Sequence, residues 1–172
     1  MTQEQTSGKR DLLDSLLGVT PDSPLAQLRA KRANLAQFTQ DSYDALLDPQ
    51  ELGGLSTVER EKVALRSALL APSAKLAAHY RERLVASGVS AEEIAAVENY
   101  PNDGPLSERE KLLLAYTDLL STHPVDGTPA DLEPLLNGGF SNRDIVTVSQ
   151  LVSFISYQAR ILASLRALQE AL

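Results

Sequence analysis

Acid–base chemistry could be carried by three side chains that lie close together in the sequence: Glu61, His79 and Tyr80. A carboxylate that is withdrawn from water gains a raised pKa and can then act as a general base. Histidine titrates close to neutral pH, so it can take up or release a proton during a reaction. We therefore single out Glu61, His79 and Tyr80 as candidate catalytic residues for proton transfer.

Each of these residues also has a structural alternative. Glu61 falls early in a predicted helix, where an exposed carboxylate is favoured by the positive end of the helix dipole. His79 can be solvated or satisfied within the core. Ser73 is predicted to cap a helix by accepting from its free N–H groups. His123 precedes a proline in a loop and is assigned no role, and two histidines this far apart do not indicate a metal site.

Several kinds of chemistry are excluded by residue types that the chain lacks. It contains no cysteine, which excludes disulfides, thiolate catalysis and cysteine-based metal or iron–sulfur sites. It also lacks G-x-G-x-x-G, P-loop, G-x-S-x-G and H-E-x-x-H patterns, which would indicate nucleotide binding, hydrolase triads or zinc. We expect neither a cofactor nor a metal.

The candidate residues lie on two predicted helices that meet at Pro72. The first begins at a capping box formed by Ser56 and Glu59. Pro72 ends it, because proline has no N–H to donate and its ring clashes with the preceding turn. The second helix runs from Pro72 to Gly88. Apolar residues at helical spacing predict the buried faces: Val58, Leu65 and Leu69 on the first helix, and Leu76, Tyr80 and Leu84 on the second.

The remainder of the chain also predicts helices, and the fold class is all-α. Residues 1–20 form a flexible segment with a short helix at 11–17, and residues 1–10 are expected to be disordered. Residues 21–172 form one helical domain. A long helix is predicted at 24–47, with residues 29–32 solvated and an apolar face comprising Leu25, Leu28, Leu35, Phe38, Tyr43 and Leu46. Further helices are predicted at 90–99, 108–121, 128–137 and from 141 onward.

Charge and hydropathy limit the partners and the compartment. The net charge is −7, and the basic residues are scattered among acidic ones. Nucleic-acid binding requires clustered Lys and Arg, so we expect no nucleic-acid partner. The N-terminus lacks the apolar core of a signal peptide, and no run of about 18 apolar residues suggests a membrane span. We therefore expect a cytoplasmic protein without a membrane partner.

The stretch at residues 56–83 resembles the alkylhydroperoxidase D-like (AhpD-like), or carboxymuconolactone decarboxylase-like (CMD), family. That family carries a Glu on one helix, a C-x-x-C pair at the start of the next helix and a His one turn later. Matched without gaps, the Glu position falls on Glu61 and the His position on Tyr80, beside His79. The two Cys positions fall on Ser73 and Leu76. The frame of the signature is present, and its thiols are missing.

Two further stretches are similar to the longer, peroxidase-related members. An LS-x-RE pattern occurs at 106–110, and an aromatic-rich run with a late arginine occurs at 154–160. The resemblance thus covers residues 20–168. It implies an AhpD-like helical bundle of about seven to eight helices that oligomerises through helix packing.

The resemblance leaves two functions open. In the first, the chain is a peroxidase-related member without peroxidase activity, forming a homo-oligomer or serving as an accessory or assembly partner of a cysteine-bearing relative. The second follows the decarboxylase branch, which manages without the cysteine pair. The chain would then be a cofactor-free acid–base enzyme, of decarboxylase or isomerase type, acting on a small organic acid or lactone through Glu61, His79 and Tyr80.

Overall fold

The computed structural model describes residues 11–71 and 73–172, and the predicted disorder of residues 1–10 lies outside this part. Within the described residues there are nine α-helices, two 3-10 helices and no strand, which confirms the all-α prediction. The α-helices are α1 (Leu12–Leu17), α2 (Pro24–Ala30), α3 (Ala33–Leu47), α4 (Thr57–Leu70), α5 (Ala74–Ala86), α6 (Ala91–Glu98), α7 (Glu108–Thr122), α8 (Glu133–Asn137) and α9 (Asn142–Ala171). The 3-10 helices, Pro124–Asp126 and Pro129–Leu132, lie between α7 and α8.

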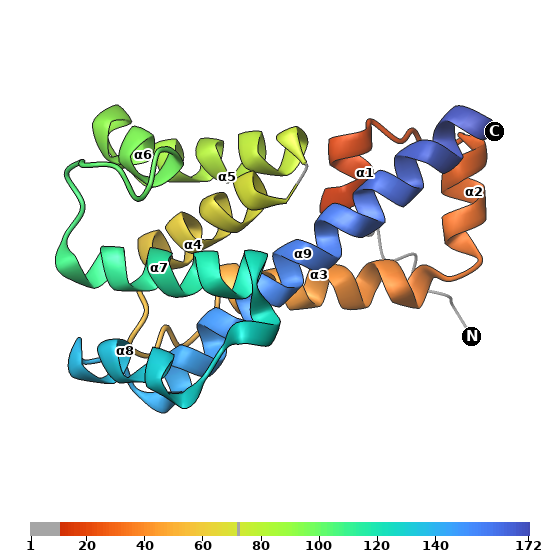
Figure 1. Cartoon of the computed structure of the whole chain (residues 1–172). Helices are drawn as coiled ribbons and strands as arrows, with labels where there is room; N and C mark the ends of the chain where they lie inside the picture. Colours follow the sequence, from red (N-terminus) through yellow and green to blue (C-terminus); the bar gives the residue numbers. More distant parts are fainter. Residues whose placement is uncertain (1–10, 72) are drawn as a thin grey trace.

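Helix α4 is the centre of the bundle. It packs against α5, α6, α7 and α9, and every residue from Arg60 to Ala68 is buried. The 30-residue α9 crosses the molecule diagonally and contacts α1, α2, α3, α4 and α7 (Figure 1). Helices α4–α7 lie at one end of the molecule, and α1–α3 surround the C-terminal part of α9 at the other.

Within the described residues, α9 is the one helix long and apolar enough to cross a membrane. Half of its most apolar window is buried inside the fold. This burial is what a core helix of a water-soluble bundle shows, since one face of such a helix packs against its neighbours. The length and hydropathy of α9 are therefore accounted for by its packing against five other helices of the bundle.

The helix starts follow the capping residues of the sequence. At α4, the Ser56 Oγ accepts from the Glu59 N–H at 3.2 Å, and the Glu59 carboxylate accepts from the Ser56 N–H at 2.8 Å. Each partner thereby satisfies a backbone donor that the helix itself leaves free. The same reciprocal arrangement opens α7, with Ser107 and Glu110, and α9, with Ser141 and Asp144.

The prediction of a single helix at 24–47 is wrong. The chain turns at Lys31 and Arg32, which separate α2 from α3. The predicted solvation of residues 29–32 also fails at Arg29, which is only 14% exposed. Its guanidinium pairs with Asp11 at 2.6 Å and also with Asp14. Both carboxylates lie at the start of α1, so the Arg29 ion pairs hold α2 against α1. The chain then turns, and α3 begins as a separate helix.

Four residues predicted to be buried are exposed: Leu28 (40%), Leu35 (51%), Phe38 (60%) and Leu69 (37%). Helical spacing identifies an apolar face, but it does not say whether this chain covers that face. Leu25 and Tyr43, predicted on the same face as Phe38, are buried at 1% and 6%. The two ends of that face, at Leu25 and Tyr43, thus contribute to the core, while the residues between them reach the surface.

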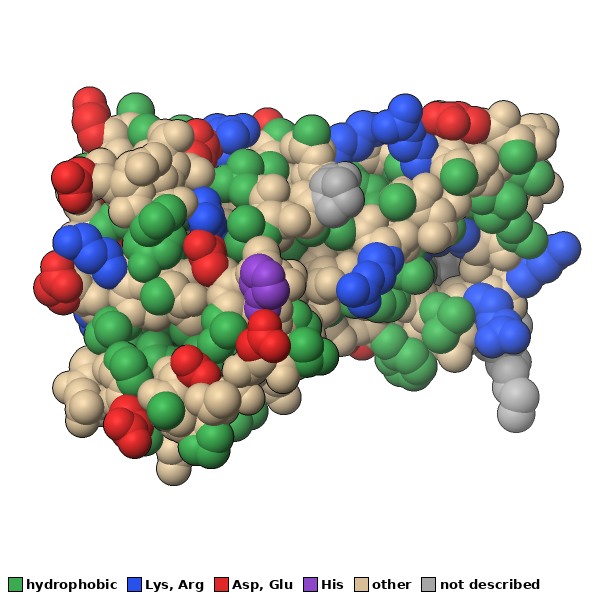
Figure 2. Space-filling view, in the orientation of Figure 1, with side chains coloured by type: hydrophobic (Ala, Val, Ile, Leu, Met, Phe, Trp, Pro, Cys, Tyr) green, Lys and Arg blue, Asp and Glu red, His purple; other side chains and the backbone are tan. Residues whose placement is uncertain are grey.

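Charge is unevenly distributed over the face of the molecule shown in Figure 2. Asp and Glu side chains gather over α6, α7 and α8, whereas Lys and Arg are more frequent over the end that holds α2 and the C-terminal part of α9. An acidic chain with a net charge of −7 therefore still presents a comparatively basic region beside α9.

Candidate functional site

Glu61 is buried, so the exposed first-turn alternative for this residue is wrong. Only 2% of it is accessible, although it belongs to the second turn of α4. One carboxylate oxygen accepts from the Arg83 Nε at 3.0 Å, and the other accepts from the Ser87 Oγ at 2.7 Å. Both partners belong to the C-terminal end of α5, which runs antiparallel to α4. The carboxylate is therefore held by an ion pair and a hydrogen bond.

Arg83 connects this carboxylate to His79 through Tyr43. Its guanidinium donates to the Tyr43 hydroxyl at 2.9 Å and pairs with Asp48 at 2.6 Å. The Tyr43 hydroxyl lies 2.8 Å from the His79 Nε2. Burial, and then the positive charge of Arg83, lower the pKa of His79, so the imidazole is neutral at pH 7. Glu61 and His79 thus belong to one hydrogen-bond chain without touching each other.

Tyr80 faces a different part of the core. It is fully buried, and its hydroxyl donates to the Gln158 Oε1 on α9 at 2.6 Å. Burial raises the pKa of Tyr80 well above the ordinary value, which keeps the phenol protonated. Its contact with His79 is an edge-on ring contact with centroids 5.0 Å apart. The three candidate residues therefore do not converge on one point, and their catalytic role stays a prediction.

The two Cys positions of the resemblance differ in exposure. Leu76 is completely buried and belongs to the main apolar cluster. Ser73 occupies the N-cap position of α5, but its hydroxyl makes no capping bond, so the predicted cap is wrong. With a backbone of φ −136° and ψ 84°, Ser73 departs from the extended geometry of the capping serines at α4, α7 and α9. Its side chain lines a shallow groove together with Lys75 and Arg166.

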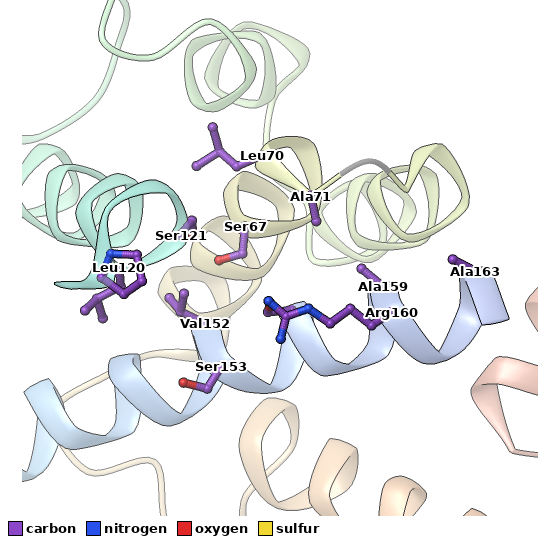
Figure 3. A pocket seen from close by; sticks show the side chains of 12 residues that line it. Ser67, Leu70, Ala71, Leu120, Ser121, Val152, Ser153, Ala159, Arg160 and Ala163 are labelled. Atoms are coloured by element: carbon purple, nitrogen blue, oxygen red, sulfur yellow. The ribbon is translucent and has the colours of Figure 1, made fainter.

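A larger pocket lies between the C-terminal parts of α4 and α7 and the middle of α9 (Figure 3). Its volume is about 460 Å³. Four serines and one arginine provide its polar lining: Ser67, Ser121, Ser153, Ser156 and Arg160. None of Glu61, His79 and Tyr80 lines this pocket.

Two hydroxyl groups in this pocket lack hydrogen-bond partners among the described residues. Ser67 is 3% exposed, and its Oγ is buried without a partner. The Ser121 Oγ, across the pocket on α7, is in the same state. Sequence reasoning missed both, because a helical serine normally lies at the surface or bonds to its own backbone. In the sequence, Arg160 stands out only as the late arginine of the 154–160 run.

Metal binding has no support in the described part of the chain, where no group of three or more His, Asp or Glu side chains could hold an ion. The polar lining of the pocket consists of hydroxyls and one guanidinium, which are poor ligands for a cation. The pocket is suited to an uncharged or anionic molecule.

Comparison with known proteins places the fold in the AhpD-like group. No protein-family model matches the chain, and no curated protein matches it. Among solved structures, an uncharacterised peroxidase-related protein from Silicibacter sp. TM1040 aligns with a TM-score of 0.71 at 17% identity, over 77% of this chain and 68% of that chain. A protein of unknown function from Agrobacterium tumefaciens, proposed to be an antioxidant defence protein AhpD, aligns with a TM-score of 0.71 at 16% identity, over 81% and 93%.

A third solved structure is a cysteine-to-alanine variant of the debrominase Bmp8 in complex with 2,3,4-tribromopyrrole. It aligns with a TM-score of 0.70 at 16% identity, over 89% of this chain and 79% of that chain. At these identities the alignments show a shared fold. The chain has the AhpD-like fold and contains no cysteine, which fits a member that is not a thiol peroxidase.

Proposed function

We propose that this AhpD-like chain is a redox-inactive accessory subunit of the cytoplasm that assembles with a second copy of itself. One observation carries the proposal: three of the four signature positions hold side chains engaged in structural contacts. Glu61 is paired with Arg83, Leu76 fills the core, and Tyr80 is bonded to Gln158. Only Ser73 is free to react, and a serine hydroxyl cannot cycle between thiol and disulfide.

The assembly face lies where α3 crosses α9. Leu35, Phe38, Phe154 and Tyr157 line a groove of about 290 Å³ together with Thr39 and Ser42. The Thr39 and Tyr157 hydroxyls bond to each other at 2.8 Å, so neither hydroxyl is left without a partner in the groove. No charged side chain lines this groove. Two copies with a net charge of −7 repel each other, so an uncharged apolar face is where self-association costs least.

Peroxidase activity is the first test. The purified chain should consume no hydroperoxide in the presence of a dithiol reductant, measured beside a cysteine-bearing AhpD protein as the positive control. Because the chain has no thiol to form a sulfenic acid, its rate should equal the rate without protein. Robust turnover would refute a redox-inactive role.

Molar mass in solution is the second test. Light scattering after size exclusion should give at least twice the 18.6 kDa of one chain. Phe38→Ser should shift the mass toward the monomer, because Phe38 is 60% exposed on the proposed face. Val125→Ser is the matched control, since Val125 is 92% exposed outside that face. A monomeric wild type would contradict self-assembly. A complex formed only with a cysteine-bearing AhpD protein would make that relative the partner.

An acid–base enzyme is the second candidate, favoured by the hydrogen-bond chain from Glu61 through Arg83 and Tyr43 to His79. The debrominase complex supports this second candidate further, because in that complex a protein of the same fold binds a small organic molecule. Turnover of small carboxylated lactones should then be lost in His79→Gln and kept in His123→Gln. Equal rates in the two variants would remove His79 from the mechanism.

A further inference from the structure

We propose that the pocket between α4, α7 and α9 binds the carboxylate of a small organic acid, with Arg160 and Ser67 as its anchors. This inference goes beyond the accessory role and does not depend on it, because the pocket shares no lining residue with the assembly face on α3. No cysteine, metal or cofactor is involved.

Two hydroxyl groups of the pocket are buried without hydrogen-bond partners among the described residues. Buried polar groups in folded proteins are nearly always hydrogen-bonded, because burial without a partner costs free energy. Ser67 is 97% buried with no partner for its Oγ, and its hydroxyl is directed toward the pocket in Figure 3. The Ser121 Oγ reaches the same pocket from α7, also without a partner. Two donors without acceptors on opposite walls are suited to a ligand that brings the acceptors.

Arg160 brings a positive charge to the pocket. Its side chain extends along α9 toward the middle of the pocket, on the side to which the Ser67 hydroxyl points (Figure 3). It is the one charged side chain in the lining, it is exposed to solvent, and no ion pair joins it to a carboxylate of the described residues. A guanidinium presents a planar fork of donors that matches the two oxygens of a carboxylate. An arginine without a partner beside unpaired hydroxyls therefore favours an anion.

The apolar walls decide the class of anion. Leu70, Leu120 and Val152 line the pocket between the polar groups. A single arginine balances one negative charge, whereas phosphate would bring a larger charge and needs more donors. A carboxylate with a short aliphatic or aromatic tail satisfies both the polar and the apolar lining. The volume of 460 Å³ is within the range of small-molecule pockets, roughly 300–1,000 Å³.

The surroundings favour entry of an anion. On the face shown in Figure 2, Lys and Arg are most frequent toward the C-terminal part of α9, away from the acidic α6–α8 end. The groove next to the pocket shares Ala159 and Ala163 with it and adds Lys75, Arg166 and Glu170. Arg166 pairs with Glu170 at 3.0 Å, so Lys75 supplies the net positive charge of the groove. A local excess of positive charge raises the concentration of anions near the opening even on an acidic protein.

Titration of the full chain with acetate, hexanoate and benzoate, followed by amide NMR signals, tests the proposal. We expect benzoate or hexanoate to bind and to shift the signals of Ser67, Ser121 and Arg160. Benzamide has nearly the shape of benzoate without its charge, so it should bind at least roughly tenfold more weakly. Equal affinity for benzoate and benzamide would overturn the proposal, as would the absence of saturable binding by all three acids. Tighter binding of inorganic phosphate would overturn the carboxylate assignment.

Variants locate the site. Arg160→Gln should weaken binding of the acid roughly tenfold or more, because it removes a charged donor. Arg143→Gln is the matched control: Arg143 is an exposed arginine on the same helix, outside the pocket, and its replacement should leave the affinity unchanged. Ser67→Ala should weaken binding roughly fivefold. Circular dichroism verifies that each variant is folded. Unchanged affinity in Arg160→Gln would overturn the proposal whatever the subunit mass.

Discussion

The buried polar side chains at the two ends of α4 differ in whether they have hydrogen-bond partners. From Arg60 to Arg66, every buried charge has partners. Arg60 donates to three backbone carbonyls at 2.7–3.3 Å, and Lys62 pairs with Glu93 and with Glu110. Arg66 forms a two-point contact with the Asp118 carboxylate at 2.6 and 2.7 Å. One residue further along, the Ser67 hydroxyl is buried without a partner and faces a pocket.

This difference distinguishes polar groups that are used up in holding the fold together from polar groups that are free to bind a ligand. Removing a charge from water is expensive, so a buried charge is compatible with folding only when it is fully bonded. Burial alone would lower the pKa of Lys62, yet the hydrogen bonds that its ammonium donates to Glu110 and Glu93 raise it, so the group remains charged. An unpaired hydroxyl costs less and is tolerated, and such local departures from the best packing concentrate at functional sites. The paired end of α4 therefore holds the fold together, and the unpaired end is available for binding.

The largest expected effect comes from breaking the paired end. Arg60→Leu should lower the free energy of unfolding by about 3 kcal/mol, because the carbonyls of Leu46, Leu52 and Leu55 lose a buried charged donor. These carbonyls anchor the segment between α3 and α4. Urea denaturation measures the change. Arg143→Gln is the control, and as an exposed substitution it should stay within about 0.5 kcal/mol. A loss in Arg60→Leu as small as that of the control would show that the three carbonyls need no partner.

A smaller effect of opposite sign is expected at the unpaired end. Ser67→Ala should raise the free energy of unfolding of the ligand-free protein by about 1 kcal/mol, because it removes a buried hydroxyl that has no partner. Ser149→Ala on α9 is the matched control. The Ser149 hydroxyl bonds to the Ile145 carbonyl at 2.9 Å and to the Tyr116 hydroxyl at 3.1 Å, so its loss should destabilise. Equal destabilisation by both substitutions would show that the Ser67 hydroxyl is satisfied.

The smallest expected effect concerns pH. The pKa of His79 is lowered in the folded state by burial and then by Arg83, whereas it is about 6.5 in the unfolded chain. Below pH 6.5 the unfolded state therefore binds more protons, and stability falls as the pH decreases from 6.5 toward the lowered pKa. Melting temperatures of His79→Gln should depend less on pH than those of the wild type between pH 5 and 7. His123→Gln, which replaces the other histidine, should keep the wild-type slope, and the reverse result would contradict the assignment.

Local chemistry explains which parts of this fold were predictable from the sequence. A capping serine with a carboxylate three residues later acts within one turn, so the starts of α4, α7 and α9 were predicted correctly. The turn between α2 and α3 contains neither glycine nor proline, and it depends on Arg29 pairing with α1. Residues far apart in the sequence determine that pairing, which is why the predicted helix at 24–47 continued through it.

The candidate site depended even more on tertiary structure. Glu61 was left between an exposed and a buried alternative, and only the antiparallel packing of α5 brings Arg83 and Ser87 to it. The pocket was not predicted, because Ser67 and Ser121 become unusual only when neighbouring helices bury their hydroxyls without supplying acceptors. Residue type and spacing identify the side chains that can react, whereas the partners that satisfy them come from the packed helices.

The complete burial of Leu76 limits what a thiol could do at this position. Replacing it with cysteine would leave a cavity in the apolar cluster and lower stability by about 2 kcal/mol. The new thiol would lie among apolar side chains, which raise the pKa of a thiol and keep it unreactive. Introducing cysteine at both positions, Ser73 and Leu76, is therefore expected to give no peroxide chemistry unless the neighbouring helices also repack around position 76.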